Sequence, residues 1–265
     1  MDLELTGKRA IVTGGSRGIG LAVARALAAE GADVALVARD KAALEVARDA
    51  VAAASGRRVI AVSADTGDDQ SVRDMVDAVV DGLGGADILV NAAARPNTGA
   101  VTGIDAFDVA DFSEQVNVKV LGYLRCIREV VPLMRAAGWG RIINISGQAA
   151  RSTGAITGSV RNVAVVALTK NLADELGKDG INVNVVHPGV TVTEQTPQTL
   201  ALRAERAGVS VPEIERRLGA GVGIGRLVTA GEVATVVAFL ASPKSVALNG
   251  DTIIASGGAV GPIYY

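Results

Sequence analysis

The sequence TGGSRGIG, residues 13–20, decides the fold because it separates two stretches of contrasting pattern. It follows the apolar run 10–12, which suits a buried strand, and precedes residues 21–27, which are good helix formers. In a strand, glycine turn and helix unit, small residues let the backbone approach a pyrophosphate, and the N–H groups of the first helical turn point at the anion. The segment therefore predicts a dinucleotide site rather than a mere tight turn.

Apolar strand candidates alternate with helical stretches along the rest of the chain. The strands are expected at 10–12, 33–38, 58–62, 86–91, 140–146, 181–186 and 252–255, and the main helices at about 41–54, 68–81, 112–135, 158–176 and 232–240. This alternation predicts an α/β protein with a single-domain doubly wound Rossmann fold, a seven-stranded parallel sheet and helices on both faces. Right-handed crossovers bring the carboxyl ends of the strands to one edge, where ligands bind.

No linker or repeat divides the chain, so residues 1–265 are expected to form one domain. The segment from about 190 to 225 interrupts the alternation, with short helices expected at 201–206 and 212–217. An insertion at the ligand edge is predicted to be a substrate lid.

Composition narrows the classes of function. The chain is 49% hydrophobic but only 3% aromatic, which suits helices packed on parallel strands. A net charge of −2 with interspersed acids and bases gives no basic stripe for nucleic acid. The single cysteine, Cys126, argues against a disulfide framework or a Cys-based metal site, and no metal is expected. Without a signal peptide or a bilayer-spanning apolar run, a soluble cytoplasmic protein that does not enter membranes is expected.

The spacing Thr-Gly-x-x-x-Gly-x-Gly near the amino end resembles that of the short-chain dehydrogenase/reductase (SDR) family, and the resemblance extends over nearly the whole chain. It implies a nicotinamide dinucleotide cofactor and contacts to it from several segments. These are Gly14, Ser16, Arg17, Gly18, Ile19 and Gly20 in the loop; Asp65 and Thr66; Asn91, Ala92 and Ala93; and Pro188, Gly189, Val190, Thr191 and Thr193 beside the nicotinamide.

The end of the second expected strand decides which dinucleotide is favoured. NAD sites usually place a carboxylate there to accept from the ribose hydroxyls. This chain has Ala38 followed by Arg39, and Arg17 in the glycine loop can approach the same region. Because an Arg fork matches phosphate geometry, NADP is predicted, with NAD the less favoured alternative. Asp40 argues mildly against this unless it caps the following helix.

The catalytic positions of the family are only partly matched. Ser146 after the fifth strand resembles the family's Ser, and Asn117 resembles its active-site Asn, so both are predicted to be catalytic. The family's Tyr-x-x-x-Lys on the next helix falls on Gly158 and Asn162 by counting from either side. Asn162 is still expected to hydrogen-bond the nicotinamide ribose.

This replacement has a chemical consequence. In the family the phenol exchanges a proton with the substrate oxygen, and the lysine lowers the phenol's pKa from its usual value near 10. Glycine offers no proton and asparagine no charge. Loss of a positioned general acid costs about 10²–10⁴ in rate.

Other side chains could take over the proton transfer. His187, the only histidine, precedes the nicotinamide segment, but a lone strand-end histidine is more often packed against the sheet. Tyr264 and Tyr265 are read first as a frayed terminus, and Tyr123 as a core or interface residue. Arg151 and Gln148 follow Ser146 and are expected to line the substrate pocket or face water.

Three functions remain open from the sequence. The first is an NADP-dependent SDR-like oxidoreductase acting on a carbonyl/alcohol or enone-type small molecule, with rebuilt proton transfer around Gly158 and Asn162. The second is an NADP(H)-binding sensor or regulatory protein without turnover, and the third is a non-redox lyase or isomerase. The retained Ser146 and Asn117 favour an enzyme. Family members usually pair through the two long helices, so the resemblance also implies a homodimer or homotetramer.

Overall fold

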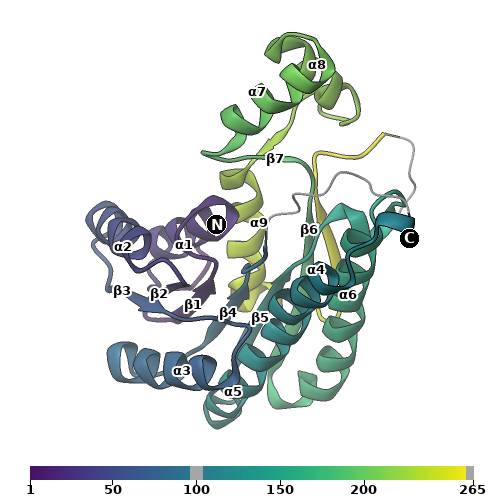
Figure 1. The fold of residues 1–265 in the computed structure, drawn as a ribbon. Coiled ribbons are helices and arrows are strands. Elements are labelled where there is room, and N and C mark those ends of the chain that lie inside the picture. The colour runs from purple at the N-terminus through teal and green to yellow at the C-terminus, as the bar shows by residue number, and fades with distance from the viewer. Residues whose placement is uncertain (96–103, 261–265) are drawn as a thin grey trace.

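The central layer of the computed structural model is a parallel sheet in the order β3-β2-β1-β4-β5-β6-β9 (Figure 1). Among residues 1–95 and 104–260, which the structure describes, seven strands form this sheet. They are β1 (Arg9–Thr13), β2 (Asp33–Ala38), β3 (Val59–Ser63), β4 (Ile88–Asn91), β5 (Gly140–Ile145), β6 (Ile181–Pro188) and β9 (Thr252–Ala255). The predicted doubly wound fold with a seven-stranded parallel sheet is confirmed.

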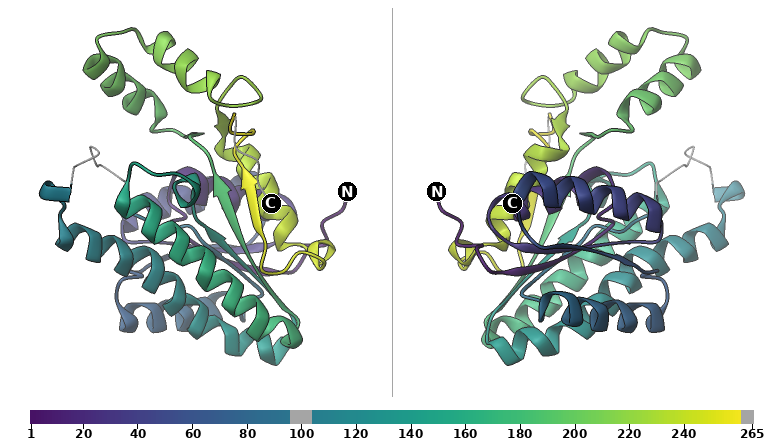
Figure 2. Two further views of the ribbon diagram at one scale, coloured as in Figure 1. Left: turned by 90° about the vertical axis from the view of Figure 1, so that its right-hand side faces the viewer. Right: turned by 90° about the vertical axis from the view of Figure 1, so that its left-hand side faces the viewer.

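Helices cover both faces of the sheet because successive strand residues point to opposite sides. Ala10 and Val12 pack with one layer of helices, whereas Ile11 packs with the other. The first layer contains α1 (Gly18–Ala29), α2 (Lys41–Ser55) and α9 (Ala230–Ala241), and the second contains α3 (Asp69–Leu83), α5 (Gly122–Ala137) and α6 (Ile156–Leu176) (Figure 2). The layers leave only the strand ends open to ligands.

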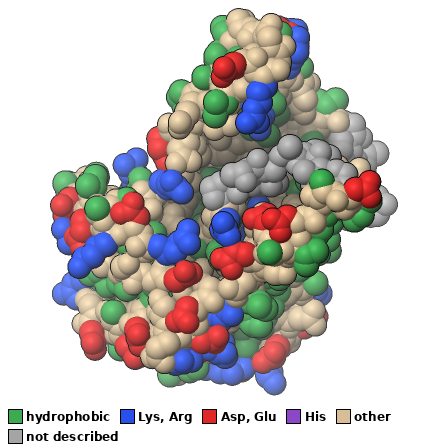
Figure 3. All heavy atoms as spheres, in the orientation of Figure 1, with side chains coloured by type: hydrophobic (Ala, Val, Ile, Leu, Met, Phe, Trp, Pro, Cys, Tyr) green, Lys and Arg blue, Asp and Glu red, His purple; other side chains and the backbone are tan. Residues whose placement is uncertain are grey.

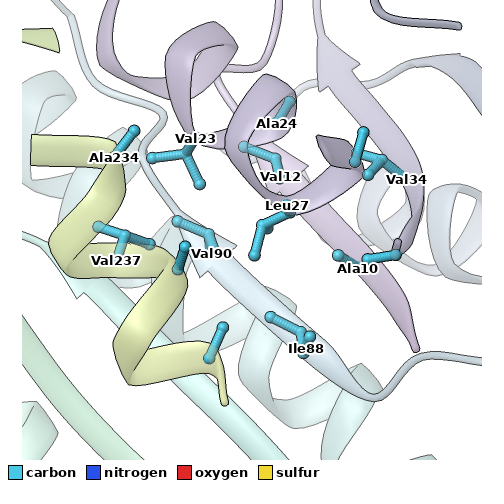
Figure 4. Packing of buried hydrophobic residues seen from close by; sticks show 14 of the residues in the cluster. Ala10, Val12, Val23, Ala24, Leu27, Val34, Ile88, Val90, Ala234 and Val237 are labelled. Carbon is cyan, nitrogen blue, oxygen red and sulfur yellow. The ribbon is translucent and has the colours of Figure 1, made fainter. Parts of the chain in front are cut away.

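The first layer is held by aliphatic side chains of modest size. Val23 and Leu27 of α1 meet Val12 and Val90 of the sheet, with Val237 of α9 alongside them (Figure 4). Full burial of each valine or leucine side chain contributes roughly 1.5–3 kcal/mol. Many such contacts fix α1, and with it the glycine loop, against the strand ends.

The long helix expected at 112–135 is interrupted by a π-helical turn. Helix α4 (Val109–Val116) leads into this turn, η2 (Asn117–Leu121), and then into α5. An i→i+5 turn rotates the following residues relative to an unbroken α-helix. This changes which side chains of the segment face the sheet edge.

The sheet order reverses beside β1, which pairs with both β2 and β4. The loops after β1 and β4 are therefore in contact. A Cβ on Gly14, whose φ is +68°, would lie 2.9 Å from the Ala92 carbonyl oxygen. Thr13 Oγ1 accepts hydrogen bonds from the Ala92 and Ala93 N–H groups at 3.1 and 3.2 Å. Such a reversal point is where doubly wound folds bind ligands.

The segment predicted as a lid forms an arm that projects from the body (Figures 1 and 2). It contains α7 (Thr196–Ala207) and α8 (Val211–Ala220), longer than the short helices expected there. Leu200, Ala204 and Ile214 form a small apolar cluster within the arm. At its base, β7 (Thr191–Val192) pairs with β8 (Val228–Thr229), a pairing the sequence did not predict.

The remaining described elements are short 3₁₀ turns: η1 (Ile104–Ala106), η3 (Gln148–Arg151), η4 (Gly177–Asp179) and η5 (Pro243–Ser245). None of the helices in the described part of the chain is long and apolar enough to cross a membrane.

Candidate functional site

A cavity of about 750 Å³ runs along the carboxyl edge of the sheet. The glycine loop forms one end, residues after β4 and β5 form the floor, and the base of the arm closes one side. In Figure 3, Lys and Arg side chains gather on the body below the arm. Most of the predicted cofactor residues line this cavity: Gly14, Ser16, Arg17, Gly18, Ile19, Gly20, Arg39, Asp65, Thr66, Ala92, Ala93, Pro188, Gly189, Thr191 and Thr193.

The glycine loop has the close packing that a dinucleotide site requires. A Cβ on Gly20 would lie 2.3 Å from the Gly14 carbonyl oxygen, so only glycine allows this turn. Helix α1 begins at Gly18, and its N-cap residue Arg17 makes no side-chain capping hydrogen bond. The first N–H groups of the helix are therefore available to an anion. These features fit a pyrophosphate.

A carboxylate already lies at this anion position. Glu194, just after β7, accepts a hydrogen bond from the Gly18 N–H at 2.8 Å. Its carboxylate occupies the kind of position that a phosphate takes at a helix N-terminus. The contact shows that the start of α1 accepts an anion, and it links that site to the base of the arm.

Arg17 and Arg39 both line the cavity and are exposed. Neither guanidinium has an ion-pair partner among the residues that the structure describes. Asp40 also lines the cavity, but its carboxylate accepts from the Ala43 N–H at 3.1 Å and caps α2. The arrangement leaves two cations for a ribose phosphate, while the nearby acid has a structural role.

Besides Asn162, two predicted cofactor residues are not among those that line the cavity, and their cofactor contacts stay predictions. Asn91 is fully buried at the end of β4, and its amide donates to Asn144 Oδ1 at 3.0 Å. Asn144 in turn donates to Thr169 Oγ1 at 3.0 Å, so these side chains join the sheet to α6. Val190 is half exposed and is not among the cavity-lining residues.

Ser146 lies on the cavity floor directly after β5 and is buried. Its hydroxyl donates to the Asn162 carbonyl oxygen at 3.1 Å. Its own carbonyl oxygen accepts a hydrogen bond from Lys119 Nζ at 3.0 Å. Ser146 and Lys119 both line the cavity, so a hydroxyl and an amine lie close together on its floor.

Lys119 belongs to the π-turn η2 and is only 4% exposed. It lines the cavity beside Ser146, and burial lowers the pKa of its ammonium to about 7, with the positive charge of Arg161 a further cause. Arg161 on α6 also lines the cavity and donates to Gln115 Oε1 at 2.5 Å. The floor therefore carries two buried cationic side chains that the sequence reasoning missed.

Asn117, which the sequence predicts to be catalytic, is not among the residues that line the cavity. Its amide donates to the Gly67 carbonyl oxygen at 3.3 Å, and its catalytic role stays a prediction. The π-turn places Lys119, two residues later, at the floor instead. Lys119 and Tyr123 are spaced i and i+4 like the buried residues Cys126 and Val130, and this spacing could have indicated that Lys119 faces inward.

Comparison with known proteins places this geometry in a family. Residues 14–260 match the family described as enoyl-(acyl carrier protein) reductase. The chain is 35% identical over 254 residues to the short-chain reductase protein NovJ of Streptomyces niveus, covering 94% of this chain and 92% of the relative. The chain belongs to the short-chain dehydrogenase/reductase (SDR) family.

Other SDR proteins are similar over almost their full length. Galactitol 2-dehydrogenase of Agrobacterium fabrum is 33% identical over 97% of this chain and 98% of its own. The crystal structure of L-sorbose reductase from Gluconobacter frateurii, complexed with NADPH and L-sorbose, superposes with a TM-score of 0.92 at 31% identity. That superposition covers 99% of this chain and 100% of the reductase.

Gly158 and Asn162, predicted to stand at the SDR Tyr and Lys positions, are buried on α6. Neither is among the residues that line the cavity. Asn162 contacts the loop after Ser146, where a Cβ on Gly147 would lie 3.1 Å from its Nδ2. Its Oδ1 is buried and has no hydrogen-bond partner among the described residues. The hydrogen bond of the Asn162 side chain to the nicotinamide ribose stays a prediction.

The proposed stand-ins for the SDR tyrosine are also placed. His187 is 1% exposed, and its Nδ1 accepts from the Gly147 N–H at 3.3 Å. Burial lowers its pKa to about 4, with the charges of Arg151 and Lys119 as lesser causes. Tyr123 lines the cavity, but its hydroxyl donates to the Ile145 carbonyl oxygen at 2.9 Å, and burial raises its pKa. Tyr264 and Tyr265 lie outside the described residues.

Proposed function

We propose that this SDR protein is an NADP-dependent oxidoreductase acting on a carbonyl/alcohol or enone-type small molecule. The observation that carries the proposal is one continuous cavity with an anion-binding helix start at one end and Ser146 at the other. When bound there, NADPH supplies a hydride. The Ser146 hydroxyl would turn from the Asn162 carbonyl oxygen to hydrogen-bond the substrate oxygen and orient it.

The choice of NADP rests on Arg17 and Arg39, whose guanidinium groups face the same cavity as the glycine loop. A planar guanidinium binds phosphate oxygens bidentately, and two of them favour a 2′-phosphate over a free hydroxyl. Asp65 is held in its own turn by accepting from the Gly67 N–H at 2.9 Å. It would contact the adenine end without repelling the phosphate.

A second candidate is an NADP(H)-binding regulator without turnover. It is favoured by Gly158 and Asn162, which offer neither a proton nor a charge at the positions assigned to Tyr and Lys. The same cavity would then bind NADPH and report its level through the arm. We favour the oxidoreductase because Ser146 lies on the cavity floor beside an ionisable amine.

Turnover of NADPH separates these two candidates. We expect the wild-type protein to bind NADPH in calorimetry and to oxidise it in the presence of a member of a panel of ketones, quinones and enones. Ser146→Ala should slow that oxidation by about 10²-fold or more, because the substrate oxygen loses its hydrogen-bond donor. Ser113→Ala is the matched control, since Ser113 is exposed on α4 and donates to Val109. Tight binding without oxidation over the whole panel would support the regulator.

We further propose that copies of the chain pair through α5 and α6. Leu124, Val160 and Val163 are exposed by 41%, 46% and 50% on these helices. Pairing there would remove apolar surface from water. Light scattering should give a dimer or a tetramer, and Val163→Glu should shift it toward the monomer.

The arm is proposed as the substrate lid, and the expected cytoplasmic location stays a prediction.

A further inference from the structure

A buried lysine on the cavity floor has no role in the function proposed so far. Lys119 lines the cavity with Ser146, Tyr123 and Arg161, and its Nζ makes a single hydrogen bond among the described residues, to the Ser146 carbonyl oxygen. An ammonium group carries three N–H donors. Two of them are left for other acceptors.

No carboxylate neutralises this amine in the described part of the chain. A buried ammonium without a counter-ion is costly, and proteins retain such groups chiefly where they act. A cation that only supported the Ser146 carbonyl would be replaceable by a neutral donor at less cost. Its burial therefore points to chemistry.

We propose that Lys119 is the catalytic proton donor that replaces the missing tyrosine, giving its proton to the substrate oxygen held at Ser146. This inference rests on the proposed oxidoreductase function. It requires only that an oxygen hydrogen-bonded to the Ser146 hydroxyl also lies within reach of the amine bonded to the Ser146 carbonyl.

The reaction balances with these groups. A hydride reaches the carbonyl carbon, the electron pair of the C=O π bond moves onto oxygen, and an N–H bond of Lys119 breaks as a new O–H bond forms. The products are the alcohol, the oxidised nicotinamide and a neutral Lys119 amine. The amine regains a proton from water that enters the cavity when the product leaves.

The other titratable side chains on the elements around the amine are poor donors. Tyr123 on α5 has its hydroxyl proton committed to Ile145, and burial raises the pKa of Cys126 on the same helix to about 12. His187 on β6 is neutral near pH 7 because its pKa is lowered to about 4. The cationic group of Arg161 stays protonated near pH 7.

The charged groups around Lys119 set its proton affinity. The positive charge of Arg161 on α6 helps to lower the pKa of Lys119. The positive charge of Arg151 in η3 helps to lower the pKa of the neighbouring His187. Asp111 on α4 is an acid whose charge acts on Arg161, and its Oδ2 accepts from Gln115 Nε2 at 2.5 Å, not from Lys119. A positive environment and burial both favour release of the proton at neutral pH.

Lys119→Met tests the role, with Lys170→Met as the control. Lys170 lies on α6, pairs with Asp174 and does not line the cavity. For a ketone that the wild-type protein reduces, we expect Lys119→Met to lower kcat by about 10²–10⁴. Lys170→Met should stay within about twofold of wild type. Circular dichroism and calorimetric NADPH binding confirm that each variant folds, with NADPH affinity kept within about fivefold.

A second readout does not depend on turnover. Competitive labelling of the protein's six lysines with an arylating reagent, followed by mass spectrometry, measures the proton affinity of each amine. We expect Lys119 to titrate near 7, well below the usual value of a lysine. The wild-type kcat for reduction should fall as pH rises through the same value, because the donor must be protonated.

Lys119→Arg separates proton donation from structural support. Arginine keeps the positive charge and can donate to the Ser146 carbonyl, but it does not release a proton near neutral pH. We expect it to be as slow as Lys119→Met. Wild-type activity in either variant would overturn proton donation by Lys119 but leave the proposed oxidoreductase standing. The same holds if borohydride traps a covalent adduct between the ketone and the Lys119 amine, because the amine would then act as a nucleophile. Absence of NADPH oxidation by the wild-type protein over the whole panel would instead overturn the oxidoreductase, and this role with it.

Discussion

Glu194 and Gly18 are joined by a hydrogen bond of 2.8 Å, from the N–H that begins α1 to the carboxylate that follows β7. The two residues are far apart in sequence but meet because the base of the arm lies over the glycine loop. The carboxylate stands where a pyrophosphate is expected to bind. The Glu194 carboxylate and the pyrophosphate of the cofactor therefore compete for the start of α1.

Glu194→Gln should tighten NADPH binding. The glutamine amide carries no negative charge. A pyrophosphate that binds at the start of α1 then neither has to displace the Glu194 carboxylate nor is repelled by it. A charge at a helix N-terminus contributes about 0.3–1 kcal/mol, and up to about 2 when partly buried, so the Kd for NADPH should fall roughly two- to fivefold, and by no more than about 30-fold. Isothermal titration calorimetry at low salt gives this value.

Glu215→Gln is the control for that experiment. Glu215 is exposed on α8 of the arm and does not line the cavity. Its replacement by glutamine removes the same charge from the protein as Glu194→Gln does. Its NADPH affinity should match that of wild type. An unchanged or weaker affinity in Glu194→Gln would contradict competition at Gly18.

Arg39→Ala should weaken NADPH binding selectively. A hydrogen bond to a charged group contributes about 1.5–3 kcal/mol, so loss of one arginine–phosphate contact should raise the Kd for NADPH roughly 10- to 100-fold. The Kd for NADH should change little, since that cofactor has no 2′-phosphate. Arg17→Ala should act in the same direction.

Arg73→Ala serves as the matched control for both arginines. Arg73 is exposed on α3, where its guanidinium donates to Gln70. Both cofactors should bind this variant as they bind wild type. Equal losses of NADPH and NADH affinity in Arg39→Ala would exclude a phosphate contact.

The fold could be predicted because its signals are local. Ala10, Ile11 and Val12 are all apolar, as expected for a strand covered on both sides, and the turn Gly14–Gly20 excludes side chains by direct contact. The site was less predictable where it depended on which residues of a helix face the cavity. Lys119 of the π-turn lines the cavity, whereas the sequence pointed to Asn117, and the Asn91 amide hydrogen-bonds Asn144. Glu194 gave no signal, because its contact joins residues distant in sequence.

His187→Asn should make the protein less sensitive to acid. In the folded state the pKa of His187 is lowered to about 4 from its usual value of 6.5, so between these values the unfolded chain binds more protons. Stability must then fall as pH drops from about 6.5 to about 4, by about 2 kcal/mol for this group alone. Asparagine keeps an acceptor for the Gly147 N–H but cannot be protonated.

Urea unfolding between pH 4.5 and 7 measures this difference. Acid-sensitive carboxylates such as Asp87, which pairs with Arg9 at 2.8 Å, affect wild type and variant alike. The gap between the two curves therefore isolates His187. Parallel curves would show that His187 is protonated equally in the folded and unfolded chains.

Gly158→Tyr with Asn162→Lys should restore activity to Lys119→Met. The double change places a phenol and a lysine at the positions assigned to the SDR pair, and the new amine lowers the pKa of the phenol so that it can donate a proton. In this background kcat should recover by at least about tenfold over Lys119→Met. Gly158→Phe with Asn162→Lys adds the same bulk without a hydroxyl and should not recover. Recovery in the phenylalanine variant would mean that filled volume, not a proton donor, is what Lys119→Met lacks. If neither variant recovers while both bind NADPH, the assignment of Gly158 and Asn162 to the SDR positions is wrong, because the new phenol would then not reach the substrate oxygen held at Ser146.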